Sequence, residues 1–233
     1  MSGSYSQLII TVVALICTVL LFEYSDIDYV IQSYFYNFST REWLLDSNNA
    51  TLDLLFYSGI KKVFIGSILF LLFALIFLRR FDWVKNNTRG LVIVVLSSFA
   101  VPLTVGALKG ATNMPCPNQL LIFNGKYEHV GLFEILPDQT SRPATRCYPA
   151  GHASGGFALL SLLFLFKSKK AKIKAFVSAM FLGWSTGGYK VLIGDHFFGH
   201  TMITMLIAWL IVLLISILVD KVSGYIFNKN IRI

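Results

Sequence analysis

A polar loop meets a hydrophobic run at residues 146–154, whose sequence is Arg-Cys-Tyr-Pro-Ala-Gly-His-Ala-Ser. Pro149 cannot continue a helix from upstream, but it is tolerated where a helix begins. Ala150 and Gly151 leave their backbone N–H groups open to approach, and the first turn of a helix has N–H groups without partners. Such a turn binds anions, phosphate above all, and it places His152 where it can exchange a proton with the anion. A plain helix start with a chance histidine is the alternative interpretation.

The chain around this stretch has the composition of a membrane protein. Of 233 residues, 55% are hydrophobic and 14% are charged, whereas an average soluble domain is about 25% charged. The length suits a single domain, 1–233. Crossing the hydrocarbon takes roughly 20 residues, and we expect an all-α membrane protein with six transmembrane helices, the fourth being short unless it includes residues 151–156. The six apolar runs are 8–22, 63–78, 90–108, 157–166, 175–193 and 201–219.

Basic residues predict the orientation of these helices. Twelve of the 20 lysine and arginine residues follow the second, fourth or sixth run. Cytoplasmic loops carry an excess of such residues, so we expect a multi-pass protein of the cytoplasmic (inner) membrane with both termini in the cytoplasm. The net charge of +8 is then mostly a topology signal, and no nucleic acid is needed to explain it. The twelve are Arg79, Arg80, Lys85, Arg89, Lys167, Lys169, Lys170, Lys172, Lys174, Lys221, Lys229 and Arg232.

Three segments remain for the outer, periplasmic side, namely 23–62, 109–151 and 194–199. The first mixes acidic and aromatic residues, and we expect a solvated loop or a ledge whose rings anchor it at the membrane surface. The other two segments, counting the helix ends beside them, contain the four histidines of the chain, His129, His152, His196 and His200. Any chemistry is therefore expected at the outer membrane surface.

Two further elements lie beside the central stretch at the outer ends of the expected helices. One is Lys-Gly-Ala-Thr-Asn-Met-Pro-Cys-Pro at 109–117, and the other begins at Gly188 and ends at His200. The order and spacing of the three resemble the type 2 phosphatidic acid phosphatase (PAP2) superfamily of membrane lipid phosphatases. That family shows a lysine, six residues and Arg-Pro; then Pro-Ser-Gly-His; then Ser-Arg, five residues, His, three residues and Asp.

The chain departs from the family pattern at several positions. Cys116 stands at the arginine of the first motif, and Ala150 at the serine of the second. In the third motif Lys190 replaces the arginine and His200 replaces the aspartate. These swaps are not neutral, because arginine holds phosphate by a two-pronged contact and lysine holds it as a point charge. Arg142 or Arg146, close to the central turn, could supply the missing guanidinium.

The resemblance implies a mechanism for the matching residues. His196 would attack phosphorus and form a phosphohistidine, and His152 would protonate the leaving oxygen. Lys109, Lys190 and the N–H groups near Ala150 and Gly151 would hold the phosphoryl group. His200 would take the place of the family aspartate and accept a hydrogen bond from the second nitrogen of His196. No metal or other cofactor is implied. Asp195 is a substitute only if the following helix starts after it.

Two other interpretations of the same residues stay open. His196 and His200, at i and i+4, have the spacing of a helical zinc pair, with His152 or Asp195 as a possible third ligand. Alternatively, the protein binds or transports a lipid without catalysis and its catalytic cations have been lost.

The expected partners are the bilayer and a phosphorylated membrane lipid whose tails stay in it. Candidates are phosphatidic acid, phosphatidylglycerol phosphate, undecaprenyl diphosphate and a lipid A phosphate. The sequence does not choose among them, nor between hydrolysis and phosphoryl transfer to another lipid.

Cysteine positions complete the predictions. Cys116 fills the slot of the family arginine and Cys147 lies two residues before Pro149, so both should approach the same pocket rim. Disulfides persist outside the cytoplasmic membrane, and we expect these two residues to be joined. Two free thiols are the alternative.

Overall fold

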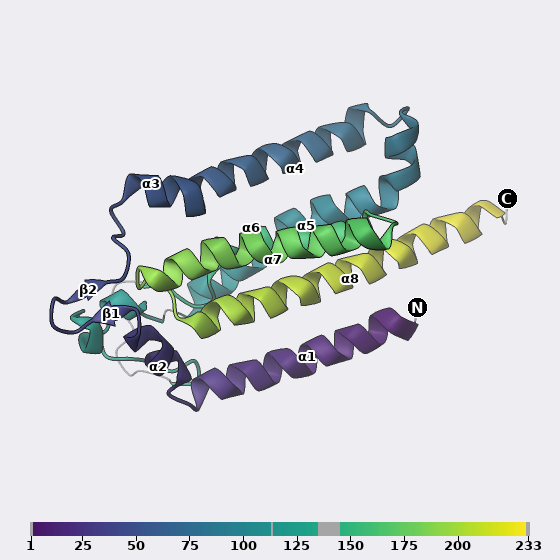
Figure 1. Ribbon diagram of the computed structural model, residues 1–233. Helices are drawn as coiled ribbons and strands as arrows, with labels where there is room; N and C mark the ends of the chain where they lie inside the picture. Colours follow the sequence, from purple (N-terminus) through teal and green to yellow (C-terminus); the bar gives the residue numbers. More distant parts are fainter. Residues whose placement is uncertain (1, 113, 135–144, 232–233) are drawn as a thin grey trace.

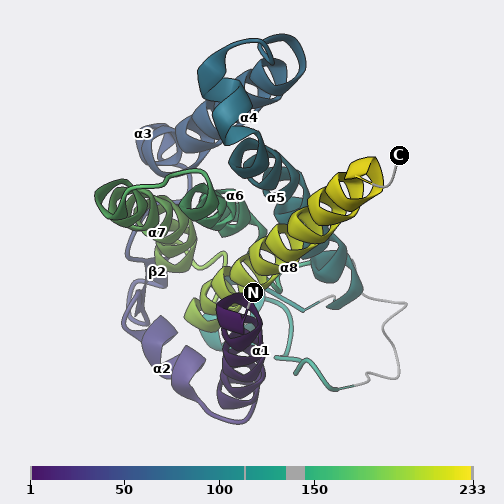
Figure 2. The same ribbon diagram turned by 90° about the vertical axis from the view of Figure 1, so that its right-hand side faces the viewer.

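In the computed structural model, which describes residues 2–112, 114–134 and 145–231, five long helices form an elongated bundle (Figure 1). Helices make up 75% of the structure. Figure 2 views the bundle nearly end-on, with α1 beside α8 and α4 at the opposite edge. The protein is therefore all-α, as predicted. The long helices are α1 (Ser2–Glu23), α4 (Gly59–Phe77), α5 (Asp82–Thr112), α7 (Lys169–Leu192) and α8 (Phe198–Ile231).

Short elements gather mostly at one end of the bundle. The strands β1 and β2 pair antiparallel in a small hairpin, with Tyr36 opposite Trp43. Three short helices and several 3-10 or π turns also connect the long helices. In chain order, with the two strands, the short elements are α2 (Ile27–Ser33), β1 (Tyr36–Asn37), β2 (Glu42–Trp43), α3 (Ala50–Asp53), η1 (Leu54–Ser58, π), η2 (Pro117–Gln119, 3-10), η3 (Leu121–Phe123, 3-10), η4 (Gly151–Ala153, 3-10), α6 (Ser154–Ala158) and η5 (Leu159–Phe164, 3-10).

The structure does not confirm the six-helix count. In the described chain, four helices are long and apolar enough to cross a membrane; they lie in α1, in residues 50–77, in α5 and in α8. The fifth run corresponds to α7, which is 24 residues long but begins in a lysine-rich turn and carries Ser185, Thr186 and two glycines near its end. These polar and small residues lower its hydropathy, although its length is sufficient.

The fourth run, predicted at 157–166, overlaps the apolar segment Gly151–Phe164, which includes the residues before it and combines η4, α6 and η5. Because 3-10 turns rise about 2.0 Å per residue, against 1.5 Å in an α-helix, the segment extends about 25 Å instead of about 21 Å. It therefore covers most of a hydrocarbon core of about 30 Å despite its few residues. Gly156 allows this segment to touch α7, because a Cβ there would lie 2.5 Å from the backbone nitrogen of Gly183.

Segments predicted to share a side of the membrane share an end of the bundle. The turns at 78–81 and 165–168 lie at the same end as the two chain termini, and segments 24–58, 114–134 and 193–197 lie at the other (Figure 1). This grouping matches the charge pattern. Which end faces the cytoplasm remains a prediction.

The packing of the bundle holds the central motif in place. Phe157, just after the motif, is fully buried among Val101 and Val105 of α5 and Ala208 and Val212 of α8. The residues of 151–158 are thus fixed between the two long helices that also carry Lys109 and His200.

Candidate active site

Two of the predicted histidines are in contact at the end of the bundle opposite the chain termini. His152 lies on η4, and His196 lies in the turn between α7 and α8. The His152 Nδ1 and His196 Nε2 atoms are 3.1 Å apart, so one ring donates a hydrogen bond to the other. His196 is only 1% exposed. Residues 44 apart in the sequence therefore form one pair of proton-exchanging groups.

The turn that carries His196 is tightly built. The backbone N–H groups of Asp195 and His196 both donate to the carbonyl oxygen of Lys190. Gly194 has φ of 77° and packs against Trp43, whose ring would lie 2.3 Å from an added Cβ. Only glycine fits this left-handed position against the indole. The turn thus fixes the His196 ring by its backbone as well as by burial.

The second nitrogen of His196 faces a disulfide. Cys116 and Cys147 are joined, as predicted, with their Cα atoms 5.1 Å apart. The Cys147 Sγ atom lies 3.4 Å from His196 Nδ1. A disulfide sulfur carries no proton and is a weak acceptor, so the ring nitrogen is the donor in this contact. The bridge therefore ties the loop after α5 to the histidine pair.

His200 does not take the predicted role beside His196. The two rings are 6.0 Å apart between centroids, and no hydrogen bond joins them in the part of the chain that the structure describes. The reason is that α8 begins at Phe198, so His196 lies before the helix and the i, i+4 relationship does not apply. Instead the His200 ring faces the backbone of Cys147, while its Nδ1 has no hydrogen-bond partner among the described residues.

Asp195, which precedes the start of α8, instead fixes a cation of the site. Its Oδ2 accepts from Lys190 Nζ at 2.9 Å, and its Oδ1 accepts from Asn118 Nδ2 at 2.9 Å. The Lys190 ammonium also lies 5.0 Å from the centre of the Tyr57 ring. The side chain that replaces the family arginine is thus held in one position by a carboxylate and an aromatic face.

The other predicted phosphate ligands are placed differently. Lys109 lies over Gly151, where an added Cβ would be 3.8 Å from its Nζ. The Ala150 N–H group donates to the carbonyl oxygen of His200 at 3.4 Å, so it is engaged and not open to an anion. Arg146 is exposed and lines neither large cavity of this end of the protein. Arg142 lies outside the described residues.

Electrostatics set the protonation of the buried histidine. The pKa of His196 is well below its ordinary value, because burial disfavours the charged ring and the neighbouring His152, Lys109, His200 and Lys190 add positive potential. The ring is therefore neutral at neutral pH. A neutral imidazole carries the lone pair that a nucleophile needs.

A family model supports the interpretation of these motifs. The model of the PAP2 superfamily matches residues 90–223, which is more than half of the chain and includes the three motifs. The chain belongs to the PAP2 superfamily. No curated protein and no solved structure matched it. Membership in the PAP2 superfamily indicates a phosphatase.

This PAP2 site contains a cation that the sequence analysis missed. Lys61 lines the same cavity as Lys109 and His152, and its Nζ lies 5.8 Å from the centre of the Tyr57 ring. Tyr57, on the π turn η1, also contacts the His152 ring edge-on, with centroids 4.8 Å apart. The spacing of Tyr57 and Lys61, one helical turn apart at the outer end of the second run, was the available signal.

The PAP2 site opens into an apolar groove of about 410 Å³ between α4, α5 and the central motif. Lys61, Lys109 and His152 lie at one end of it. Its walls are apolar, and several of the side chains that form them are themselves exposed. The wall residues include Phe64, Ile65, Ile68, Leu69, Phe99 and Pro102.

The predicted alternative of a zinc site receives limited support. Within the described ranges, the one group of side chains close enough to hold a metal is Cys147, His196 and His200, whose ligand atoms lie within 4.8 Å of one another. Metal binding uses a cysteine thiolate, and the Cys147 sulfur is bonded to Cys116. The donor set that remains is two histidines, which does not fit a zinc centre of three or four protein ligands.

Proposed function

We propose that this PAP2 protein is a lipid phosphatase, which hydrolyses a phosphomonoester or diphosphate on a membrane lipid through a phosphohistidine formed on His196. The observation that carries this proposal is the position of His152, Lys61 and Lys109 at the end of an apolar groove, with His196 in contact with His152. The groove residues Ile65, Leu69 and Phe99 are 46%, 56% and 53% exposed. The groove thus opens laterally, where acyl chains would remain in the bilayer while the phosphate reaches the histidines.

The proposed reaction uses the two ring nitrogens that are in contact, His152 Nδ1 and His196 Nε2. His196 Nε2 would attack phosphorus and the bond from phosphorus to the leaving oxygen would break, with His152 donating a proton to that oxygen. Water would then attack the phosphohistidine and release phosphate. Since in-line transfer puts phosphorus between nucleophile and leaving group, the bound substrate must separate the 3.1 Å contact between the rings.

Three lysines would stabilise the transferred group. Lys61 and Lys109 line the groove together with His152, and Lys190 and Lys61 both lie near the Tyr57 ring that contacts His152. Charges that are fixed before the reaction stabilise the transition state without reorganisation. The first family motif has an arginine at the position of Cys116, and Lys61 is proposed to supply the positive charge that is missing there.

Sidedness belongs to the same proposal. The end of the bundle with the site lacks the basic turns, and the positive-inside rule therefore assigns it to the outer face of the cytoplasmic membrane.

The proposed reaction is tested by phosphate release from detergent-purified protein. The substrates are phosphatidic acid, phosphatidylglycerol phosphate, undecaprenyl diphosphate and a lipid A phosphate, each with and without EDTA. We expect release from at least one lipid to persist in EDTA, and to be slower with glycerol 3-phosphate, which has no acyl chains to occupy the groove.

Three results would change the assignment. EDTA-sensitive release that zinc restores would favour a metal site. Lipid binding without release would favour a non-catalytic protein, and phosphate appearing on a second lipid would indicate a transferase.

The positive charge of Lys61 in the groove gives a second prediction. Replacing Lys61 by alanine is expected to lower kcat/KM for the lipid phosphate about tenfold or more, because a charge-assisted contact to the phosphoryl group is lost. The adjacent Lys62 does not line the groove, so Lys62→Ala is expected to stay within about twofold, as surface changes away from a site do. Equal losses in the two variants would remove Lys61 from the site.

A further inference from the structure

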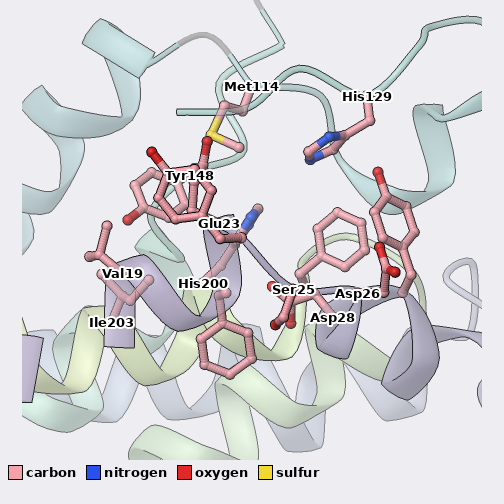
Figure 3. Close-up of a pocket in the computed structure, with 14 residues that line it drawn as sticks. Val19, Glu23, Ser25, Asp26, Asp28, Met114, His129, Tyr148, His200 and Ile203 are labelled. Carbon is pink, nitrogen blue, oxygen red and sulfur yellow. The ribbon is translucent and has the colours of Figure 1, made fainter. Parts of the chain in front are cut away.

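A second cavity lies on the other side of the turn that carries His196. It has a volume of about 310 Å³ and is formed by α1, α2, the start of α8 and the loop after α5 (Figure 3). It shares no lining residue with the groove of the proposed phosphatase site. Nothing in the reaction proposed above uses it.

The charge of this cavity is opposite to that of the phosphate site. Glu23, Asp26 and Asp28 line it, and none of the described residues lining it is a lysine or arginine. The pKa of Asp28 is raised to about 7 by burial, despite a hydrogen bond from the backbone of Gly199. The pKa of His129 is lowered by burial, so that this ring is neutral. The cavity therefore presents negative and neutral acceptors, and no lysine or arginine among its described lining residues faces them.

An unpartnered acceptor faces the same space. His200 is 4% exposed and lines the cavity, and its Nδ1 has no hydrogen-bond partner among the described residues. The Cys147 backbone faces the ring on its other side, so Nδ1 can accept a hydrogen bond when the ring proton is on Nε2. Figure 3 shows His200 and His129 directed into the cavity from α8 and from the loop, respectively. A buried acceptor of this kind is costly unless a donor reaches it.

Aromatic rings form much of the wall. Tyr148 contacts the His200 ring edge-on with centroids 5.0 Å apart, and Tyr29 contacts the His129 ring at 5.3 Å. Phe22, Tyr24 and Phe197 also line the cavity. Aromatic faces attract cations, most strongly where water is excluded.

We propose that this cavity binds a primary ammonium group of a small organic amine, free or carried on a lipid head group. The ammonium would donate N–H groups to His200 Nδ1 and to the carboxylates of Glu23 and Asp28, with its charge against the tyrosine and phenylalanine rings. A quaternary ammonium has no N–H to donate and would leave His200 Nδ1 unsatisfied. The cavity lining does not offer a metal three close ligands, because the one such cluster among the described residues shares only His200 with the cavity, and its other members, Cys147 and His196, do not line it.

Helix α2, which forms part of the cavity, also holds the turn that carries His196. The Asp28 Oδ1 atom accepts from the backbone N–H of Gly199 at 2.7 Å, at the start of α8. Gln32, one turn later on α2, donates to the carbonyl oxygen of Val191 at 2.8 Å, at the end of α7. An amine held by Asp28 and His200 would thus stabilise both ends of the turn that carries His196.

Binding is tested with ethanolamine on the full-length, detergent-purified protein by calorimetry and thermal unfolding. We expect saturable binding of ethanolamine, with choline and ethylene glycol at least about tenfold weaker, because the first lacks N–H donors and the second lacks charge. The proposal is overturned if choline binds as tightly as ethanolamine. It is also overturned if ethanolamine does not bind, unless the bilayer-disc experiment described below shows binding of a lipid head group.

A matched pair of variants locates the site. Glu23→Gln removes one carboxylate charge of the cavity and is expected to weaken ethanolamine binding about tenfold or more. Glu42→Gln removes the same charge from the exposed strand β2 and is expected to leave binding unchanged. Unliganded melting temperatures check that both variants are folded, and equal affinity of Glu23→Gln and wild type overturns the assignment.

Bilayer discs distinguish the two sources of the amine. If the ligand is a lipid head group, discs of phosphatidylethanolamine raise the melting temperature of wild type above that in phosphatidylcholine, and Glu23→Gln abolishes the difference. If the ligand is a free amine, the discs give no difference and ethanolamine alone binds. Absence of both effects rejects the ammonium site without bearing on phosphate release.

Discussion

Replacing His196 by asparagine is expected to lower lipid phosphate hydrolysis on the order of 10³–10⁵-fold, as is typical when a covalent nucleophile is removed. Asparagine occupies similar space but has no ring nitrogen to attack phosphorus. The loss is expected to be equal for an alkyl phosphate and for an aryl phosphate such as p-nitrophenyl phosphate. Initial rates with each substrate, on protein whose melting temperature is checked, give the measurement.

His152→Asn provides the comparison for this experiment. A proton donor matters less when the leaving group is already stable as an anion, so the loss is expected to be much smaller for the aryl phosphate than for the alkyl phosphate. This difference separates proton donation from attack. Retention of wild-type rates within about tenfold by His196→Asn would mean that another group or water attacks phosphorus directly.

Removal of the disulfide is expected to lower both stability and activity. The bridge closes a separation of 31 residues, and the chain-entropy model gives about 3–4 kcal/mol for a loop of that size. In the double variant Cys116→Ser/Cys147→Ser, the free energy of unfolding should fall by about that amount. Phosphate release should fall as well, because Cys147 lies 3.4 Å from His196 Nδ1. Denaturant unfolding in detergent and initial rates provide the two measurements.

Cys17 supplies the matched control for the disulfide variant. It is the free cysteine of the chain and lies exposed on α1, away from the histidine pair. Cys17→Ser should leave the unfolding free energy within about 0.5 kcal/mol of wild type, as surface changes do. Equal stability of the double variant and this control would show that the bridge does not hold the loop.

Motif order and spacing predicted the parts of the site that depend on where chain segments meet the ends of helices. His152 and His196 were expected together because both fall at the same end of the apolar runs. Their Nδ1 and Nε2 atoms, respectively, are 3.1 Å apart. The family resemblance placed Cys116 in the slot of the motif arginine, beside the turn that Cys147 precedes, and the two cysteines are joined. Such predictions combine the helix ends given by hydropathy with the positions of the family motifs.

Features that depend on local backbone geometry could not be predicted in this way. The role expected for His200 assumed a helix through residue 196, but Gly194 and the Lys190 carbonyl form a turn, so that α8 begins at Phe198. Lys61 reaches the site from α4, and no spacing rule relates α4 to a motif about 90 residues later. Asp28 and Gln32 are buried in a segment whose acidic and aromatic composition predicted a solvated loop or a ledge at the membrane surface. Each outcome depends on tertiary contacts.

The 3-10 turns η4 and η5 within residues 151–164 give the histidine pair a connection to membrane thickness. The six residues of η5 lose about 3 Å of length if they rewind as an α-helix. A thinner bilayer favours the shorter form, because hydrophobic mismatch costs free energy for each ångström. His152 is at the outer end of this segment, whereas His196 belongs to a separate turn held by α2. We therefore expect bilayer thickness to change the separation of the two rings.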